Sequence, residues 1–454
     1  MHDAGPMFTP PMTEDADPRG GARAPSAPVP AGGSTAPPKG LRRLVLDTTP
    51  LRIRPYRRLW SSTIVTAVGS QLTAVAVPKQ LYDDTGSSGW VGLSGLVALV
   101  PLVVFALWGG AIADAVDRRK LLVVTNGGLA FTSALLWAQA AVGSRSVWIV
   151  LVLLGLQQAF FGMNSPARSA SVARLVPREM LPAANALNAT VMNLGQIAGP
   201  LLAGALIPVL GISTLYLIDS VALVVAVGAV VRLPALPPLD GLRRRAGLRE
   251  VIDGFRYLSA HRILLVSFLA DIIAMVFGMP RALFPELAAE TYGGPAGAGL
   301  ALGVLYAAIP VGSLLGGLFS GSFTRIRRHG VGVVVAVVVW GLSIVGFGLS
   351  GSLVLAAVFL GVGGAADLAS MVFRSSILQE AATDEMRGRM QGVFTVVVAG
   401  GPRLADLVHG TGGAVAGTTA TITGGGVLVV VGMLLAVLAF PSFWAYRAGV
   451  SRGP

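Results

Sequence analysis

Long apolar runs separated by short polar segments alternate along the chain from about residue 59 to residue 441. Many of these runs approach the roughly 20 residues that a helix needs to cross a bilayer. Backbone polar groups inside a bilayer must be satisfied within the segment, so helices are expected rather than open strands. Twelve spans are predicted, at residues 59–82, 90–113, 120–142, 147–168, 183–208, 213–232, 262–285, 297–321, 330–350, 352–374, 388–411 and 418–441.

The polar residues between these runs recur at a fixed interval. Arg168-Ser169 reappears as Arg374-Ser375, 206 positions later, and Met180 is matched at the same interval by Met386. Two similar apolar halves are typical of a transporter built from parallel repeats, with its site between the halves. The predicted fold is therefore an all-α membrane protein of twelve transmembrane helices, in which two six-helix bundles form a parallel, pseudo-twofold repeat.

Three segments differ in composition from the apolar halves. Residues 1–45 are rich in Pro, Gly, Ala and Ser and lack the apolar region of a signal peptide, which favours a disordered tail. From Leu248 to Leu258, apolar residues recur at helical spacing with charged residues between them, which predicts an amphipathic helix at the membrane interface or packed in the linker. The predicted domains are a cytoplasmic tail (1–45), an N-terminal bundle (46–232), a cytoplasmic linker (233–261), a C-terminal bundle (262–441) and a cytoplasmic tail (442–454).

The basic residues predict how the chain is oriented. With the N-terminus in the cytoplasm, all but four of the 34 Lys and Arg residues fall in segments assigned to the cytoplasmic side, Arg168 and Arg374 among them. This distribution satisfies the positive-inside rule. The net charge of +12 is thus explained by topology and not by nucleic-acid binding. A multi-pass protein of the cytoplasmic membrane is predicted, with both termini in the cytoplasm and the lipid bilayer as a partner.

Composition excludes several other classes. Charged residues make up 12% of the chain, against about 25% in a typical soluble protein. The sequence has no phosphate-binding loop that would let ATP drive transport directly, no cysteine and only four scattered histidines. No enzyme active site, metal or cofactor is therefore expected.

The loop after the second predicted span carries a recognisable pattern. It reads Gly110-Ala-Ile-Ala-Asp114-Ala-Val-Asp117-Arg118-Arg119 and resembles the signature loop of the major facilitator superfamily, Gly-x-Leu-Ala-Asp-Arg-x-Gly-Arg-Arg. The resemblance implies that Gly110, Asp114, Arg118 and Arg119 act in the cytoplasmic gate. Ala and Asp replace the first Arg and the second Gly, and the alternative is a generic basic loop.

A second pattern lies in the fifth predicted span. Gly195, Gly199, Pro200 and Gly204 resemble the antiporter motif Gly-x-x-x-Gly-Pro-x-x-Gly-Gly, with Ala203 in place of one Gly. Proline can kink a helix and glycine allows close helix packing. The resemblance implies export rather than import, so a nutrient importer is the disfavoured alternative. The other alternative is a helix-packing motif without a role in transport, which would have the same sequence pattern.

Several short segments narrow the resemblance further. They are Ala76-Val77-Pro78, Ala235-Leu236-Pro237-Pro238, Gly254-Phe255-Arg256-Tyr257-Leu258, Leu305-Tyr306-Ala307-Ala308-Ile309-Pro310 and Gly388-Arg389. Together they are similar to the enterobactin-exporter family. This resemblance implies proton-driven efflux of a siderophore by alternating access. The wider group includes macrolide and multidrug efflux antiporters, which remain the alternative; a receptor without transport activity is disfavoured.

Charged and amide side chains within the spans are the candidate site residues. Pro78-Lys79 and Pro280-Arg281 occupy matching places 202 positions apart, which predicts that both cations flank the cavity and attract an anionic or polyphenolic small molecule. Snorkelling to the headgroups is the alternative. Two glutamines stand where many drug antiporters have an arginine. The predicted cavity residues are Gln71, Lys79, Gln157, Gln158, Arg281 and Arg403.

Four acids lie within predicted spans, and three of them are assigned to proton coupling. A buried carboxylate that binds and releases a proton suits an antiporter. Asp271 is the first choice. Asp406 is one helical turn from Arg403, and Asp367 is within reach of Arg374, so a structural ion pair is the alternative for both. Asp219, the fourth acid, is not assigned a role.

Overall fold

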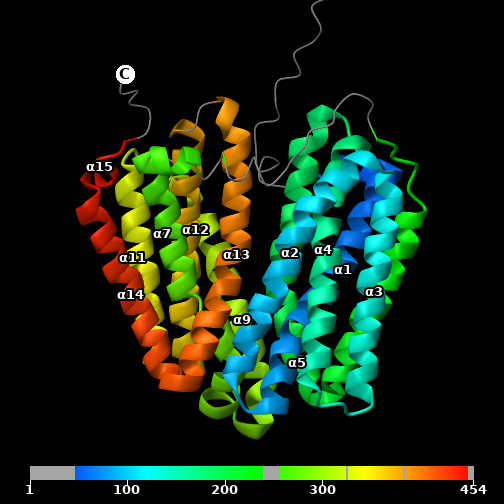
Figure 1. Cartoon of the computed structure of the whole chain (residues 1–454), viewed down its shortest axis with the longest axis horizontal. Coiled ribbons are helices and arrows are strands. Elements are labelled where there is room, and N and C mark those ends of the chain that lie inside the picture. The colour runs from blue at the N-terminus through cyan, green and yellow to red at the C-terminus, as the bar shows by residue number, and fades with distance from the viewer. Residues whose placement is uncertain (1–46, 239–252, 254–255, 324–325, 382–383, 448–454) are drawn as a thin grey trace, which may run out of the picture. The chain divides into compact units, whose positions relative to one another are not determined.

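The computed structural model describes residues 47–238, 253, 256–323, 326–381 and 384–447 (Figure 1). These residues form helices joined by turns and loops. The long helices are α1 (Arg54–Thr85), α2 (Ser88–Ala115), α3 (Arg118–Ala141), α4 (Val147–Leu175), α5 (Leu181–Val231), α7 (Arg262–Gly278), α9 (Gly294–Leu318), α11 (His329–Gly348), α12 (Leu353–Ala381), α13 (Asp384–Ala416) and α14 (Thr418–Ala439). The short ones are η2 (Thr49–Arg52), η3 (Arg178–Met180), η4 (Arg281–Leu283), α8 (Phe284–Glu286), η5 (Leu287–Tyr292), α10 (Ser320–Phe323) and α15 (Pro441–Trp444).

Nine helical segments of the described residues are long and apolar enough to cross a membrane. The protein is therefore an all-helical membrane protein, as the apolar runs predict. The predicted spans 183–208 and 213–232 are the two parts of α5, which is interrupted at Gly211 (φ 75°, ψ 165°). The predicted span 262–285 is α7, which continues through η4, α8 and η5 as far as Tyr292.

Tight turns gather at one end of the helices. Gly86 ends α1, Gly143 follows α3, and Gly417 separates α13 from α14; their φ values are 64°, 71° and 84°. The break at Gly211 lies at this same end. A positive φ is disfavoured for residues with a Cβ, so glycine is required for these reversals. We call this the Gly86 end, and the opposite one, where Asp117 caps α3, the Asp117 end.

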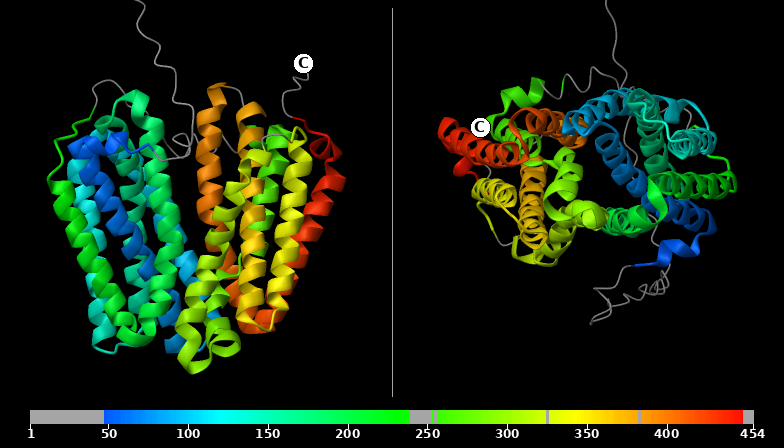
Figure 2. Two further views of the ribbon diagram at one scale, coloured as in Figure 1. Left: turned by 180° about the vertical axis from the view of Figure 1, so that it is seen from behind. Right: turned by 90° about the horizontal axis from the view of Figure 1, so that it is seen from below.

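Each half of the chain packs mainly on itself. In the first half α1 lies against α5, α2 against α4, and α3 against both α4 and α5. In the second half α9 and α11 lie against α12, α13 and α14 lie against α7, and α14 also lies against α11. Figures 1 and 2 show these groups as the blue-to-green and the green-to-red sides of the bundle.

Two helix pairs make most of the contact between the halves, and both use glycine. In the pair α2–α13, a Cβ on Gly92 would lie 2.9 Å from the Cα of Gly410. In the pair α5–α9, a Cβ on Gly204 would lie 2.9 Å from the Cα of Gly303. Both are shorter than the 3.5–4.0 Å at which carbon atoms pack. The two halves therefore touch backbone to backbone near the Gly86 end.

Hydrogen bonds reinforce this junction. The hydroxyl of Tyr82 donates to Glu290, and the hydroxyl of Ser88 donates to Glu286. Both acids belong to the second half and both hydroxyls to the first. Both of these hydrogen bonds between the halves lie at the Gly86 end. We call the two glycine contacts and these two hydrogen bonds the Gly86-end junction.

The linker between the halves begins against the first half. Leu233 and Leu236 are buried, at 2% and 4% exposure. Of the predicted amphipathic helix, Asp253 and residues 256–260 are helical, and Leu258 is buried. The rest of that predicted helix, like the predicted tail 1–45, lies outside the described residues.

Candidate transport site

Three predicted residues meet in the second half around one buried ion pair. Arg374 of α12 contacts Asp271 of α7, and both side chains are almost fully buried, at 4% and 2% exposure. A second nitrogen of Arg374 lies 3.9 Å from Asp367, whose side chain is 23% exposed. Removing two charges from water is costly unless they pair, so this pair holds α7 and α12 in register. Asp271 and Asp367 thus both lie close to the same cation, Arg374.

A second group of charges lies beside η4. Arg403 and Asp406, both on α13, are 4.0 Å apart, with side chains 34% and 16% exposed. Arg281, at the start of η4, lies within electrostatic reach of Asp406 and Asp367. Among the described residues, no carboxylate lies within 4.0 Å of Arg281. We call the six residues of the two groups the C-half charge cluster: Asp271, Arg281, Asp367, Arg374, Arg403 and Asp406.

The repeated Arg-Ser motif has a different location from the one expected. Arg168 and Arg374 were both assigned to cytoplasmic segments, but they lie within α4 and α12 with their guanidinium groups turned into the protein. Arg168 donates to the hydroxyl of Thr63 at 2.6 Å and to the amide oxygen of Asn164 at 3.3 Å. The repeat therefore marks one internal arginine in each half, with polar partners in the first half and acidic partners in the second.

The predicted cavity residues do not form one group. Lys79 forms an ion pair with Asp83, one turn along α1. The side chain of Gln71 packs over Gly199 of α5. On α4, Gln157 is buried and Gln158 is half-buried. Only Arg281 and Arg403 belong to the C-half charge cluster, and the positive charge of Lys79 is balanced locally.

The loop that resembles the superfamily signature holds the start of the linker. Asp117 caps α3 by accepting from the backbone N–H of Arg119 at 2.8 Å, and it also accepts from the backbone N–H of Leu236 at 3.1 Å. Arg118 donates to the carbonyl of Ala113 at 3.1 Å, and Arg119 donates to that of Val231 at 2.5 Å. Gly110 has open space beside it, and the side chain of Asp114 lies outside the described part.

Asp117 is a residue whose role was missed from the sequence. It occupies the glycine position of the signature and appears there as a departure. An N-cap aspartate before a run of basic residues is the signal that could have found it. Its carboxylate joins the first turn of α3 to the linker, so this departure adds a contact at the Asp117 end.

The glycines of the antiporter-like motif face two different helices. Gly195 packs on Ala67 and Gly199 on Gln71, both of α1. Gly204 packs instead on Gly299 and Gly303 of α9, in the other half. The motif therefore joins α5 to its own bundle along most of its length and to the opposite bundle near the Gly86 end.

The arrangement of the helices is that of a membrane transporter, and the comparisons give the family. The family model described as "Transmembrane secretion effector" matches residues 47–447. The chain belongs to this family of the major facilitator superfamily, whose members are transporters rather than enzymes.

Two relatives are exporters. The chain is 30% identical over 400 residues to the enterobactin exporter EntS of Citrobacter koseri, covering 87% of this chain and 94% of that protein. It is 29% identical over 397 residues to EntS of Shigella boydii, covering 86% and 93%. These relatives agree with the predicted family.

Solved structures agree on the fold. A bacterial homologue of the human lysosomal transporter Spinster, in an inward-facing and occupied conformation, gives a TM-score of 0.68 at 14% identity, covering 90% of this chain and 100% of that one. The nucleoside transporter NupG gives 0.68 at 13% identity, covering 86% and 99%. At these identities the likeness concerns the fold alone.

Proposed function

We propose that this protein is a proton-driven exporter of an enterobactin-like siderophore that works by alternating access. The observation that carries the proposal is the match over most of the chain to the enterobactin exporters. Arg281 and Arg403 add a chemical reason, because catecholate siderophores are acidic and polyphenolic. Efflux of macrolides or other drugs is the alternative that the experiment below separates.

The proposal includes a twelve-span topology. Nine segments qualify as spans by length and composition. Counting the two parts of α5 separately and adding α1 and α13 gives twelve, as six in residues 46–232 and six in residues 262–441. The positive-inside rule, applied to the basic segments at the Asp117 end, supports a cytoplasmic location for that end and for both termini. The short turns of the Gly86 end then face the exterior.

With this orientation, the chain is in an inward-facing state. The two halves meet at the Gly86-end junction, and Figure 1 shows their ribbons diverging toward the opposite end. In alternating access, a substrate enters from the cytoplasm while the outer junction is closed and leaves after it opens. The glycines of α2, α5, α9 and α13 let that junction close without intervening side chains.

Arg281 is the residue we assign to substrate recognition. It is partly buried and has no carboxylate within 4.0 Å in the described part of the chain. A partly buried cation without an ionic partner favours an anionic ligand. Arg403 already lies 4.0 Å from Asp406, so an anionic ligand must compete with Asp406 for the guanidinium group of Arg403. Lys79, Gln71, Gln157 and Gln158 stay predictions.

The acids of the C-half charge cluster supply a coupling mechanism. Asp271 and Asp367 share Arg374, and Asp406 is next to Arg403. Protonation of an acid breaks its ion pair, so the arginine no longer fixes the contact between the helices that carry the pair. In antiport this change favours the state that releases the substrate, so that proton binding and substrate binding oppose each other.

Secretion by a deletion strain tests the proposed function. Under iron limitation, loss of the gene is expected to reduce the catecholate siderophore in the medium, and the intact gene is expected to restore it. Complementation with Arg281→Ala should fail, whereas Arg178→Ala, which removes an exposed arginine of η3, should succeed. Normal secretion with raised macrolide sensitivity would instead support the drug-efflux alternative.

A further inference from the structure

An unassigned acid, Asp219, lies inside the first half. It follows the Gly211 break on α5 and is 1% exposed. Its Oδ2 accepts from the hydroxyl of Thr73 on α1 at 2.6 Å and from that of Ser133 on α3 at 2.9 Å. Its Oδ1 has no hydrogen-bond partner among the residues that the structure describes. Glycine at position 69 of α1 makes room for this carboxylate, which would collide with any Cβ there.

Within the described part of the chain, no cation balances this carboxylate. Among the described residues, no Lys, Arg or His lies within 4.0 Å of Asp219, whereas Asp271, Asp367 and Asp406 each lie that close to an arginine. Arg168 is bound to Thr63, and ten residues of α1, or about 15 Å at 1.5 Å per residue, separate Thr63 from Thr73.

The groups that face Asp219 are almost all neutral and non-titrating. Helix α1 presents Gly69 and Thr73, and α3 presents Ser133. The titratable neighbour is Tyr216, one turn earlier on α5, which lies within electrostatic reach of both Asp219 and Asp84. Burying an unpaired carboxylate costs far more than burying a neutral carboxylic acid. This environment therefore suits an acid that binds a proton at its free Oδ1.

Contacts through Ser133 and Tyr216 link this acid to a cleft at the Gly86 end. Ser133 donates to the carbonyl of Tyr216 at 3.2 Å, and the hydroxyl of Tyr216 donates to Gln80 at 2.9 Å. Gln80 and Gln139 form a reciprocal amide pair at 3.2 and 3.0 Å. These contacts reach from the carboxylate to the side chain of Gln80, with the covalent frame of Tyr216 joining its carbonyl to its hydroxyl.

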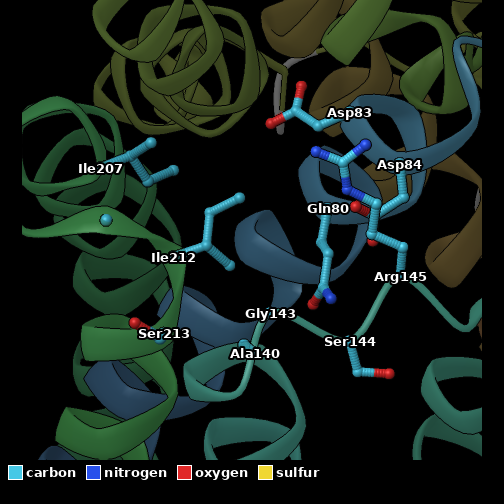
Figure 3. Close-up of a pocket in the computed structure, with 11 residues that line it drawn as sticks. Gln80, Asp83, Asp84, Ala140, Gly143, Ser144, Arg145, Ile207, Ile212 and Ser213 are labelled. Carbon is cyan, nitrogen blue, oxygen red and sulfur yellow. The ribbon is translucent and has the colours of Figure 1, made fainter.

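Gln80 also lines the cleft, whose volume is about 430 Å³. Figure 3 shows Gln80, Asp84 and Arg145 on one side of the cleft, with Ile207 and Ile212 opposite. The cleft includes Gly211, where α5 is interrupted. A movement of the two parts of α5 would therefore act on the cleft and on the helix that carries the acid.

We propose that Asp219 is a proton-binding site of the first half, loaded from the cleft at the Gly86 end past the Gln80–Gln139 pair. The proton forms an O–H bond at Oδ1 and leaves as a free proton; no other bond changes. As a step in coupling, this role rests on the proposed proton-driven export. It makes Asp219, which has no arginine within 4.0 Å among the described residues, a proton-binding acid of the first half in addition to the acids of the C-half charge cluster.

Infrared spectroscopy of the purified full-length protein tests the site without a substrate. As the pH is lowered, the wild type should gain the C=O stretching band of a buried carboxylic acid. Asp219→Asn should lose one component of this band, and Asp47→Asn, which alters an exposed acid, should retain the whole band. A band of full size in Asp219→Asn, or no band in the wild type, would overturn the proposal.

A second variant covers the case in which Asp219→Asn does not fold. Thr73→Val removes one hydroxyl donor and keeps the acid, so the band should remain but its pH midpoint should move. An unmoved midpoint would contradict the assignment of the band to Asp219.

Transport then tests the coupling role. In proteoliposomes, Asp219→Asn should carry enterobactin down its own gradient but lose the acceleration by an imposed pH gradient. Retained acceleration would refute coupling through Asp219. If the wild type moves no enterobactin, the proposed function fails, while the infrared result still decides whether Asp219 binds a proton.

Discussion

Substituting Gly204 by Val should open the Gly86 end. A Cβ at this position would lie 2.5 Å from the carbonyl oxygen of Gly299 and 2.9 Å from the Cα of Gly303. Carbon atoms pack at about 3.5–4.0 Å, so the two helices must separate by at least about 0.6 Å. Overpacking of this kind costs about 1–3 kcal/mol. The penalty falls only on the state in which α5 touches α9.

A penalty of this size changes the ratio of closed to open molecules by a factor of about 5–150. Spin labels can report this change, because the chain contains no cysteine and an introduced pair is unique. Val142 and Val415, at 80% and 89% exposure, lie at the Gly86 end of opposite halves. Distances between labels on these positions should shift toward longer values in Gly204→Val.

A matched control is available on the same helix. Gly228 has nothing within 4 Å of an added Cβ, so Gly228→Val changes helix propensity equally without a clash. Its distance distribution should match that of the wild type. If Gly204→Val gives the same distribution as Gly228→Val, the junction does not depend on this glycine contact and the reasoning is refuted.

Three further perturbations have defined outcomes. Asp271→Asn leaves Arg374 buried without its main partner and should destabilise the protein by about 3–5 kcal/mol, measured as a lower Tm in detergent. Neutralising both residues should restore part of the lost stability, and an unchanged Tm for Asp271→Asn would contradict the ion pair. Ser88→Ala removes the hydrogen bond to Glu286 and should destabilise the closed state by about 0.5–1.5 kcal/mol. The distances between the spin labels should therefore shift less than in Gly204→Val, and no shift would count against this hydrogen bond. Asp117→Ala removes a helix cap that contributes about 0.5–2 kcal/mol and a hydrogen bond to the linker, so limited proteolysis should cut the linker faster. An unchanged cleavage rate would argue against the proposed role of Asp117 in holding the linker.

The helices could be predicted from the sequence because their signals are local. Apolar length defines each span, and the break in α5 coincides with a glycine between two apolar runs. The glycine motif on α5 also predicted close helix packing. Which helix each glycine meets was not predictable, because Gly204 and Gly303 are about 100 positions apart and meet only when the two halves pack.

The charged residues show the limit of local signals more clearly. The sequence identified the embedded acids and the local pairs Asp406–Arg403 and Asp367–Arg374, but not the partner of Asp271, which comes from a distant helix. Asp271 and Arg374 are about 100 positions apart, and Arg374 was expected in the cytoplasm because basic residues near span ends are usually there. Asp219 had no distinguishing pattern. Asp219 is buried against Thr73 of α1 and Ser133 of α3, with no cation within 4.0 Å among the described residues. These contacts arise only when the three helices pack together, so the sequence could not predict them.

The central claim is that this chain exports an acidic siderophore at the expense of a proton gradient. The most direct measurement uses the purified full-length protein in liposomes, with enterobactin on the side of the Asp117 end and a pH gradient imposed across the membrane. The account predicts that enterobactin crosses toward the more acidic compartment, faster with the gradient than without it, and that Arg281→Ala abolishes this transport. Equal rates with and without the gradient, or no transport by the wild type, would contradict it.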